Sequence, residues 1–114
     1  MSLDPEFVAE ARAWMVKASC QQAAEKTLKG FLAWHGRIFR KTHDIAELGR
    51  QVLDITPQLE ALLRECALLT DYASKFRYPG ESTEPASEEV PAAVALTRRL
   101  NEAILAELPQ EVCP

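Results

Sequence analysis

Glycine and histidine are scarce in this 114-residue sequence, which holds four glycines and two histidines. It has no glycine-rich loop of the kind that holds nucleotide phosphates, no Ser–His–Asp arrangement and no metal-ligand spacing. It also lacks the alternating polar and apolar pattern of β-strands, and it has no internal repeat. These absences argue against a P-loop nucleotidase, a serine hydrolase and a zinc domain. The sequence predicts neither a metal ion nor a cofactor.

The three cysteines, Cys20, Cys66 and Cys113, are odd in number and have no paired spacing. This favours free thiols in a reducing compartment over a disulfide framework or a zinc site. Cys66 falls on an apolar helical stripe and is expected in the core. No apolar signal segment opens the chain, and no apolar run is long enough to span a bilayer. We therefore expect a cytoplasmic protein without membrane contact.

The net charge of −4 argues against a general nucleic-acid coat protein. The charge is uneven, however, because basic residues gather between Lys26 and Arg50 and acidic residues dominate from Tyr78 onward. Solvated helix faces would explain this asymmetry. The alternative is a basic site that receives phosphate or an acidic partner.

Apolar residues at helical spacing dominate what is present. Asp4 can cap a first helix that begins at Pro5, and nothing before Gly30 breaks it, so we expect one helix over Pro5–Trp34. Its apolar stripe shifts phase near residues 18–23. Gly36 suits a left-handed helix end. The sequence thus predicts a single all-α domain over residues 1–114, an antiparallel up-down bundle with an unusually long first helix.

Three further helices are expected. One runs over Asp44–Asp54, and the next begins with Thr56 as cap and Pro57 at the first position and ends at Lys75 or Phe76. A loop rich in proline and small polar residues follows. The last helix begins between Ser87 and Pro91 and continues through Leu108. Trp14 and Trp34 fall at helical positions that are typical of core residues.

The segment between the first two helices holds the leading candidate site. Its residues are Arg37, Arg40, Lys41 and His43. Asp44 can cap the helix that follows, and Glu47 would complete a capping box. Basic side chains beside a helix N-terminus, whose N–H groups face outward, suit a phosphate or another anion. A local capping role is the alternative for His43, and His35 is expected to end the first helix.

A second candidate is Arg77-Tyr78, within the loop that follows the third helix. It could contribute to the same phosphate site. The alternative is structural, because Pro79 and Gly80 end a helix and Tyr78 could pack on the bundle.

Three motifs in order resemble the HEPN domain, the small helical domain named for its occurrence in higher eukaryotes and prokaryotes. They are Gln21-Gln22-Ala23-Ala24-Glu25-Lys26 with Leu28-Lys29, then Lys41-Thr42-His43-Asp44-Ile45 with Leu48, and then Tyr72 with Arg77-Tyr78-Pro79. The resemblance covers the chain from about Cys20 to Leu108, and residues 11–17 resemble the family's opening helix. The loop that normally separates the first two helices of the family is missing, because Lys17-Ala18-Ser19 runs directly into Cys20-Gln21.

The resemblance implies a helical bundle that is usually dimeric and is linked to nucleotides or RNA. Many prokaryotic members act with a minimal nucleotidyltransferase in toxin–antitoxin or related pairs. Some members are ribonucleases that use an Arg and a His four to six residues apart. Arg37 and His43 satisfy that spacing, but they precede the second helix, whereas the family's pair follows a later helix, near Arg77. No histidine follows Arg77 here.

These observations give three functional hypotheses. The first is a nucleotide- or RNA-binding module without strong catalysis, with Arg37, Arg40, Lys41, His43, Arg77 and Tyr78 as phosphate contacts and a nucleotidyltransferase partner. The second is a metal-independent ribonuclease with His43 as general base and Arg37 or Arg77 stabilising the phosphate. The third is a helical protein-interaction module. For all three we expect a homodimer in which the long first helix is exchanged between chains; a kink near Ala18–Cys20 is the alternative.

Overall fold

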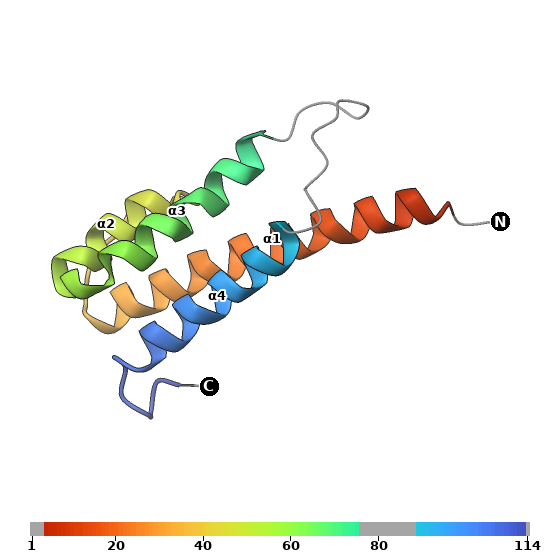
Figure 1. Cartoon of the computed structure of the whole chain (residues 1–114). Helices are drawn as coiled ribbons and strands as arrows, with labels where there is room; N and C mark the ends of the chain where they lie inside the picture. Colours follow the sequence, from red (N-terminus) through yellow and green to blue (C-terminus); the bar gives the residue numbers. More distant parts are fainter. Residues whose placement is uncertain (1–3, 76–88, 114) are drawn as a thin grey trace.

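The computed structural model describes residues 4–75 and 89–113. These residues form helices and connecting segments, and no β-strand occurs among them (Figure 1). The elements are α1 (Pro5–Trp34), α2 (Ile45–Ile55), the short 3₁₀-helix η1 (Pro57–Leu59), α3 (Glu60–Lys75) and α4 (Glu89–Leu105). The all-α class and the bounds of the long first helix are confirmed.

The long helix α1 spans 30 residues without interruption. It starts where the Glu6 N–H donates to the Asp4 side chain at 2.9 Å. It ends at His35, after which Gly36 adopts a φ of 67°. The Arg37 N–H donates to the carbonyl of Leu32 at 2.9 Å, which completes a Schellman-type helix end. Because the helix continues through residues 18–20, the alternative of a kink there is wrong.

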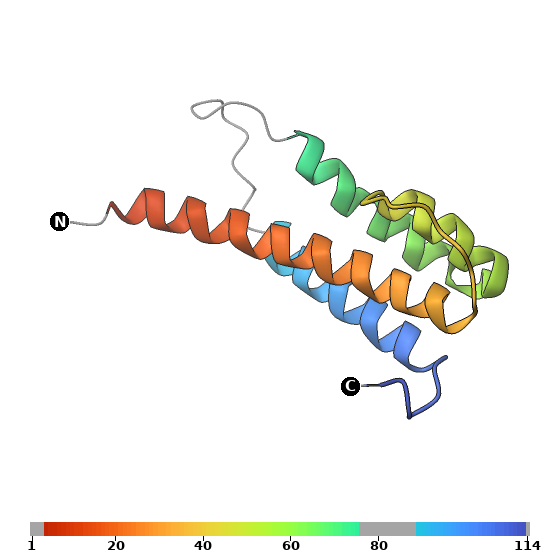
Figure 2. The same ribbon diagram turned by 180° about the vertical axis from the view of Figure 1, so that it is seen from behind.

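Helices α1, α2 and α4 run in one direction and α3 runs against them (Figures 1 and 2). His43, just before α2, contacts Glu25 in the middle of α1, while Thr56, just after α2, donates a hydrogen bond to Glu107, beyond the end of α4. The predicted up-and-down order thus holds from α2 to α3 and from α3 to α4. Residues 35–44 run back along α1, so that α2 follows the direction of α1 (Figure 2).

The core lies between the C-terminal half of α1 and the other three helices. Its largest fully buried side chains include Phe31, Leu28, Leu48, Leu100 and Ile104. Every buried residue of α1 lies at Lys17 or later. Val16 still packs against the edge of the core, and the first turns of α1 extend beyond the bundle (Figure 1). Phe7 and Met15 in the N-terminal part of α1 are 69% and 68% exposed.

Two sequence interpretations fail at the helix ends. Glu47 does not complete a capping box, because it pairs with Arg40 while the Asp44 N–H donates to Thr42. Trp34 is 52% exposed rather than buried, because it points to a different side of the last turn of α1 from Phe31 and Leu32, which are fully buried. Trp14 is half-buried.

The later helix bounds follow the predictions closely. Pro91 is the third residue of α4, within the first turn, where a missing N–H leaves no helical bond unmade. α4 ends at Leu105, three residues before the expected Leu108, because the N–H groups of Glu107 and Leu108 bond to carbonyls three residues back.

Cys20, Cys66 and Cys113 are free thiols, and Cys66 is fully buried, as predicted. Within the described residues, no helix is long and apolar enough to cross a membrane.

Candidate functional site

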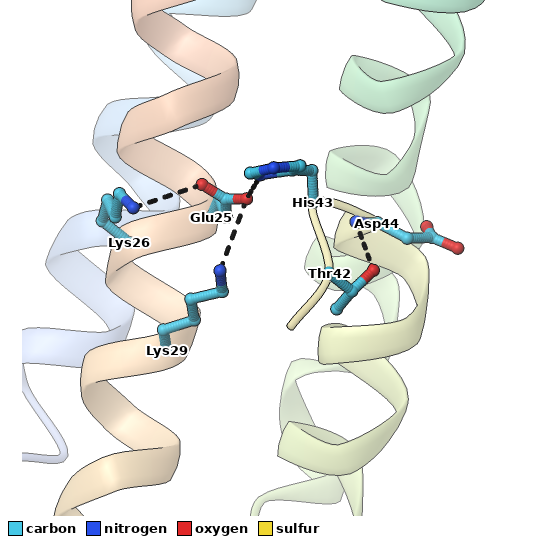
Figure 3. A network of polar contacts seen from close by, with 6 residues as sticks. All are labelled: Glu25, Lys26, Lys29, Thr42, His43 and Asp44. Atoms are coloured by element: carbon cyan, nitrogen blue, oxygen red, sulfur yellow. Dashed lines mark hydrogen bonds and ion pairs between the residues drawn. The ribbon is translucent and has the colours of Figure 1, made fainter. Parts of the chain in front are cut away.

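The centre of the candidate site is a contact between α1 and the loop that precedes α2, formed by Glu25 of α1 and His43 of the loop (Figure 3). Nδ1 of His43 is hydrogen-bonded to Oε1 of Glu25. The amino group of Lys29 lies 3.6 Å from the same oxygen, and that of Lys26 lies 3.7 Å from Oε2. One carboxylate therefore receives three basic groups.

Burial and charge act in opposite directions on Glu25. Its side chain is only 5% exposed, and burial by itself would raise the pKa of the carboxyl group. The hydrogen bond from His43 and the charges of Lys29 and Lys26 outweigh burial, so the pKa of Glu25 lies below its ordinary value. Glu25 is therefore ionised at neutral pH, and His43 Nδ1 is then the donor in their bond.

One ring nitrogen of His43, Nδ1, is hydrogen-bonded, and the other, Nε2, has no hydrogen bond to the described residues. Its side chain is 82% exposed although Nδ1 is bound to Glu25. Nε2 has no partner among the described residues, so it could accept or deliver a proton at the surface. A carboxylate that orients a histidine in this way is a common arrangement in acid–base catalysis. The geometry also suits recognition of a phosphate by an oriented ring.

Arg40 is held by a second ion pair, with Glu47 of α2. Nε and Nη2 of Arg40 donate to the two carboxylate oxygens of Glu47 at 2.6 and 2.8 Å. This bidentate pair raises the pKa of Arg40 and lowers that of Glu47. Arg40 therefore fastens the loop to α2, and its charge is largely balanced.

The N-terminus of α2 is occupied by the chain itself. The Ala46 N–H donates to the Asp44 carboxylate at 3.0 Å. The Asp44 N–H donates to Thr42 Oγ1 at 3.0 Å, as Figure 3 shows. The predicted cap of Asp44 is thus confirmed. Because its carboxylate takes the position of an external anion, side chains rather than these N–H groups are what the loop can offer to a phosphate.

Arg37 and Lys41 differ from Arg40 and His43. Both are exposed, and neither forms an ion pair within residues 4–75 and 89–113. Ile38 beside Arg37 is 96% exposed, and Trp34 one helical turn earlier is 52% exposed. The outer part of the loop thus combines two unbalanced positive charges with apolar surface.

The remaining predicted site residues are placed as follows. Arg77 and Tyr78 lie outside the described residues. His35 caps the end of α1 and its ring contacts that of Phe31 at a centroid distance of 4.6 Å. Within the described residues, no cluster of histidine, cysteine, aspartate and glutamate could hold a metal ion.

Sequence reasoning missed the role of Glu25, although it lies in the first matched motif. The available signal was its position: Glu25 stands beside Ala24 and one turn before Leu28, on the buried side of α1. A carboxylate at such a position requires a partner. Which residue supplies it depends on how residues 35–44 fold back.

Fold and site together define a small all-α domain whose helices are joined at a Glu–His contact beside a basic loop. The HEPN domain family model matches residues 10–108. The chain belongs to the HEPN domain family. Neither the curated proteins nor the solved structures contain a match.

Proposed function

We propose that this chain is a HEPN module that binds the phosphate groups of a nucleotide or RNA through the loop of residues 37–43. The main observation in support is that the four basic residues of this loop differ in their contacts. His43 and Arg40 are tied to Glu25 and Glu47, whereas Arg37 and Lys41 are exposed and unbalanced. The first two hold the shape of the loop, and the second two contact phosphate.

The exposed surface beside these charges fits the same ligand class. Trp34 and Ile38 flank Arg37 in the chain and are both exposed. An aromatic face beside a cation supports stacking of a base while the cation holds the phosphate. Arg77 and Tyr78, from the matched family motif, complete the proposed set of contacts.

The proposed biological setting is a pair with a minimal nucleotidyltransferase, of the toxin–antitoxin kind, in the cytoplasm. Membership of the HEPN family supports this setting. In such a pair the chain acts as a homodimer that presents the basic loop. A plain interaction module would use the same loop to dock an acidic protein surface, and it would show no affinity for nucleotide or RNA.

Fluorescence anisotropy with labelled ATP and a short labelled RNA tests the proposal. The double variant Arg37→Ala with Lys41→Ala removes two charges from the loop. We expect it to weaken RNA binding and to lower the slope of log affinity against log salt by about 2. Arg64→Ala with Arg99→Ala removes the same charge from α3 and α4 and should leave the slope near that of the parent. Equal losses in both double variants would contradict the loop as the site.

A ribonuclease is the second candidate, and the Glu25–His43 contact favours it. With Nδ1 bound to Glu25, Nε2 of His43 could take the proton of a ribose 2′-hydroxyl, and Arg37 or Arg77 would stabilise the charge developing on phosphate. Our leading proposal expects little or no cleavage by the purified chain. Rapid cleavage that disappears in His43→Ala and weakens in Glu25→Gln would replace binding with catalysis as the function.

A further inference from the structure

An apolar groove lies between α1 and α4, which run side by side (Figures 1 and 2). Its volume is about 400 Å³. α1 contributes six residues from Arg12 to Ala23, and α4 contributes Val94, Thr97 and Arg98. Between Arg12 and Ala23, α1 rises by roughly 16 Å, which is about three turns. The groove therefore has the length of a short helix.

The floor of the groove offers apolar contacts, and the hydroxyl protons there are already used. The Ser19 hydroxyl donates to the Met15 carbonyl at 2.9 Å, and the Thr97 hydroxyl donates to the Ala93 carbonyl at 2.8 Å. Cys20 is a free thiol that is only 6% exposed, and such a buried thiol behaves as a small apolar side chain. The Met15 side chain is 68% exposed. The floor therefore suits apolar side chains of a ligand.

Two arginines supply the charge of the groove. Arg12 and Arg98 both line it, and no acidic residue lines it within 4–75 and 89–113. Neither arginine forms an ion pair with a residue of those ranges. The neighbouring Arg99, by contrast, is bound to Glu65 of α3 at 3.1 Å. The groove thus holds two unbalanced positive charges beside an apolar floor, in a chain whose net charge is −4. A complementary ligand carries carboxylates beside an apolar stripe.

The shape of the groove favours a helix over a small molecule. Met15, Ser19 and Ala23 are all exposed, so the groove is shallow. A small ligand needs a cavity that buries most of its surface, whereas an amphipathic helix needs only an apolar surface along one side. The short side chains of Ser19 and Ala23 also let the backbone of another helix come close to α1.

We propose that the groove between α1 and α4 docks an acidic amphipathic helix from a different protein. The apolar stripe of that helix lies on Met15 and Val16 and on the floor between α1 and α4. Its carboxylates reach Arg12 and Arg98, which have no carboxylate of their own among the described residues. Apolar contact supplies the affinity, and the two arginines select an acidic helix over a basic one.

The groove lies on a different side of α1 from the proposed phosphate site. Glu25, which binds His43, follows Val16 by nine residues, or about two and a half turns, and so points to the opposite side of α1. The inference is therefore independent of the proposed function. Arg12→Ala with Arg98→Ala should leave the salt dependence of RNA binding unchanged. A lower salt slope in that variant would place the groove within the RNA site and would overturn the inference.

Fluorescence anisotropy with a labelled model peptide tests the docking. The peptide has about 18 residues, enough for some helix in water, with leucines three and four positions apart and glutamates beside them. We expect saturable binding to the parent and about tenfold weaker binding to Arg12→Ala with Arg98→Ala. Arg64→Ala with Arg99→Ala removes the same charge outside the groove and should bind as the parent does. Equal binding by the two double variants contradicts the proposal, and so does binding of a peptide whose leucine spacing is scrambled.

An exchange of charge separates docking from a general loss of structure. Arg12→Glu with Arg98→Glu should reject the glutamate peptide and bind the same peptide with lysine in place of glutamate. The parent should reject the lysine peptide. If the variant binds neither peptide while its circular dichroism spectrum matches that of the parent, these arginines do not contact the helix and the proposal is wrong.

A matched pair of substitutions tests the apolar part of the groove and the other occupants. Met15→Glu places a charge in the groove and should abolish peptide binding, whereas Phe7→Glu changes an equally exposed residue of α1 that does not line it. If sedimentation shows a dimer that Met15→Glu alone dissociates, a second copy fills the groove and the proposal fails. It also fails if sodium laurate binds in an Arg98-dependent way and the peptide does not bind.

Discussion

His43 binds Glu25 across 18 positions of sequence, and the contact joins an exposed imidazole to a buried carboxylate. It connects two of the motifs by which the chain resembles its family. Because α2 begins at the next residue but one, the contact also sets where α2 lies along α1. His43, which the sequence offers as a candidate general base, thus has a structural role as well, because its contact with Glu25 fixes the start of α2 against α1.

Replacing Glu25 should destabilise the bundle. We expect Glu25→Gln to lower the free energy of unfolding by about 2 kcal/mol, because an amide cannot accept charge-assisted bonds from His43 and two lysines. Urea denaturation measures the change. Glu60→Gln breaks an exposed pair with Arg64 and should change the free energy by less than about 0.5 kcal/mol. Equal effects would show that the Glu25 network contributes no more than a surface pair.

The Glu25 network should also make stability depend on pH in the acidic range. The pKa of Glu25 is lowered in the folded chain, so the folded state favours the ionised carboxylate more than the unfolded state does. Its contribution is complete above the ordinary value of 4.5 and is lost as pH falls through the lowered pKa. The difference in unfolding free energy between the parent and Glu25→Gln should therefore shrink below pH 4.5. A difference that grows on acidification would contradict this assignment.

Releasing Arg40 should strengthen anion binding. Glu47→Gln removes the carboxylate that balances Arg40, which leaves a third unbalanced charge in the loop. We expect tighter RNA binding and a salt slope larger by about 1. Glu60→Gln removes the same charge beside Arg64 on α3 and serves as the control. If both variants bind alike, the gain reflects net charge and not the loop.

The thiols should react at very different rates. Burial raises the pKa of Cys66 to about 11, so at pH 8 almost none of it is thiolate, and the side chain is fully buried. Cys113 is only half-buried. Timed labelling with a thiol reagent, followed by mass spectrometry of peptides, should show Cys113 modified well before Cys66. Labelling of Cys66 at the rate of Cys113 would mean that the α3 side of the core opens readily.

Sequence alone determined the helices, since their signals act over a few residues. Asp4 and Asp44 cap the N-termini of α1 and α2, and Gly36 follows the end of α1. Pro57 and Pro91 lie in the first turns of η1 and α4. Each of these residues acts within one helical turn of its own position. The apolar spacing of α1 likewise indicated that its two halves have different surroundings, and all of its buried residues lie at Lys17 or later.

Tertiary structure decided which charges remain available at the candidate site. Arg37, Arg40, Lys41 and His43 look equivalent in the sequence, yet two of them are balanced by carboxylates that packing brings close. Glu25 reaches His43 only because residues 35–44 run back along α1, a path that no short pattern encodes. Ion pairs between distant residues depend on how helices pack, because a charge interacts strongly only with what lies within a few ångströms.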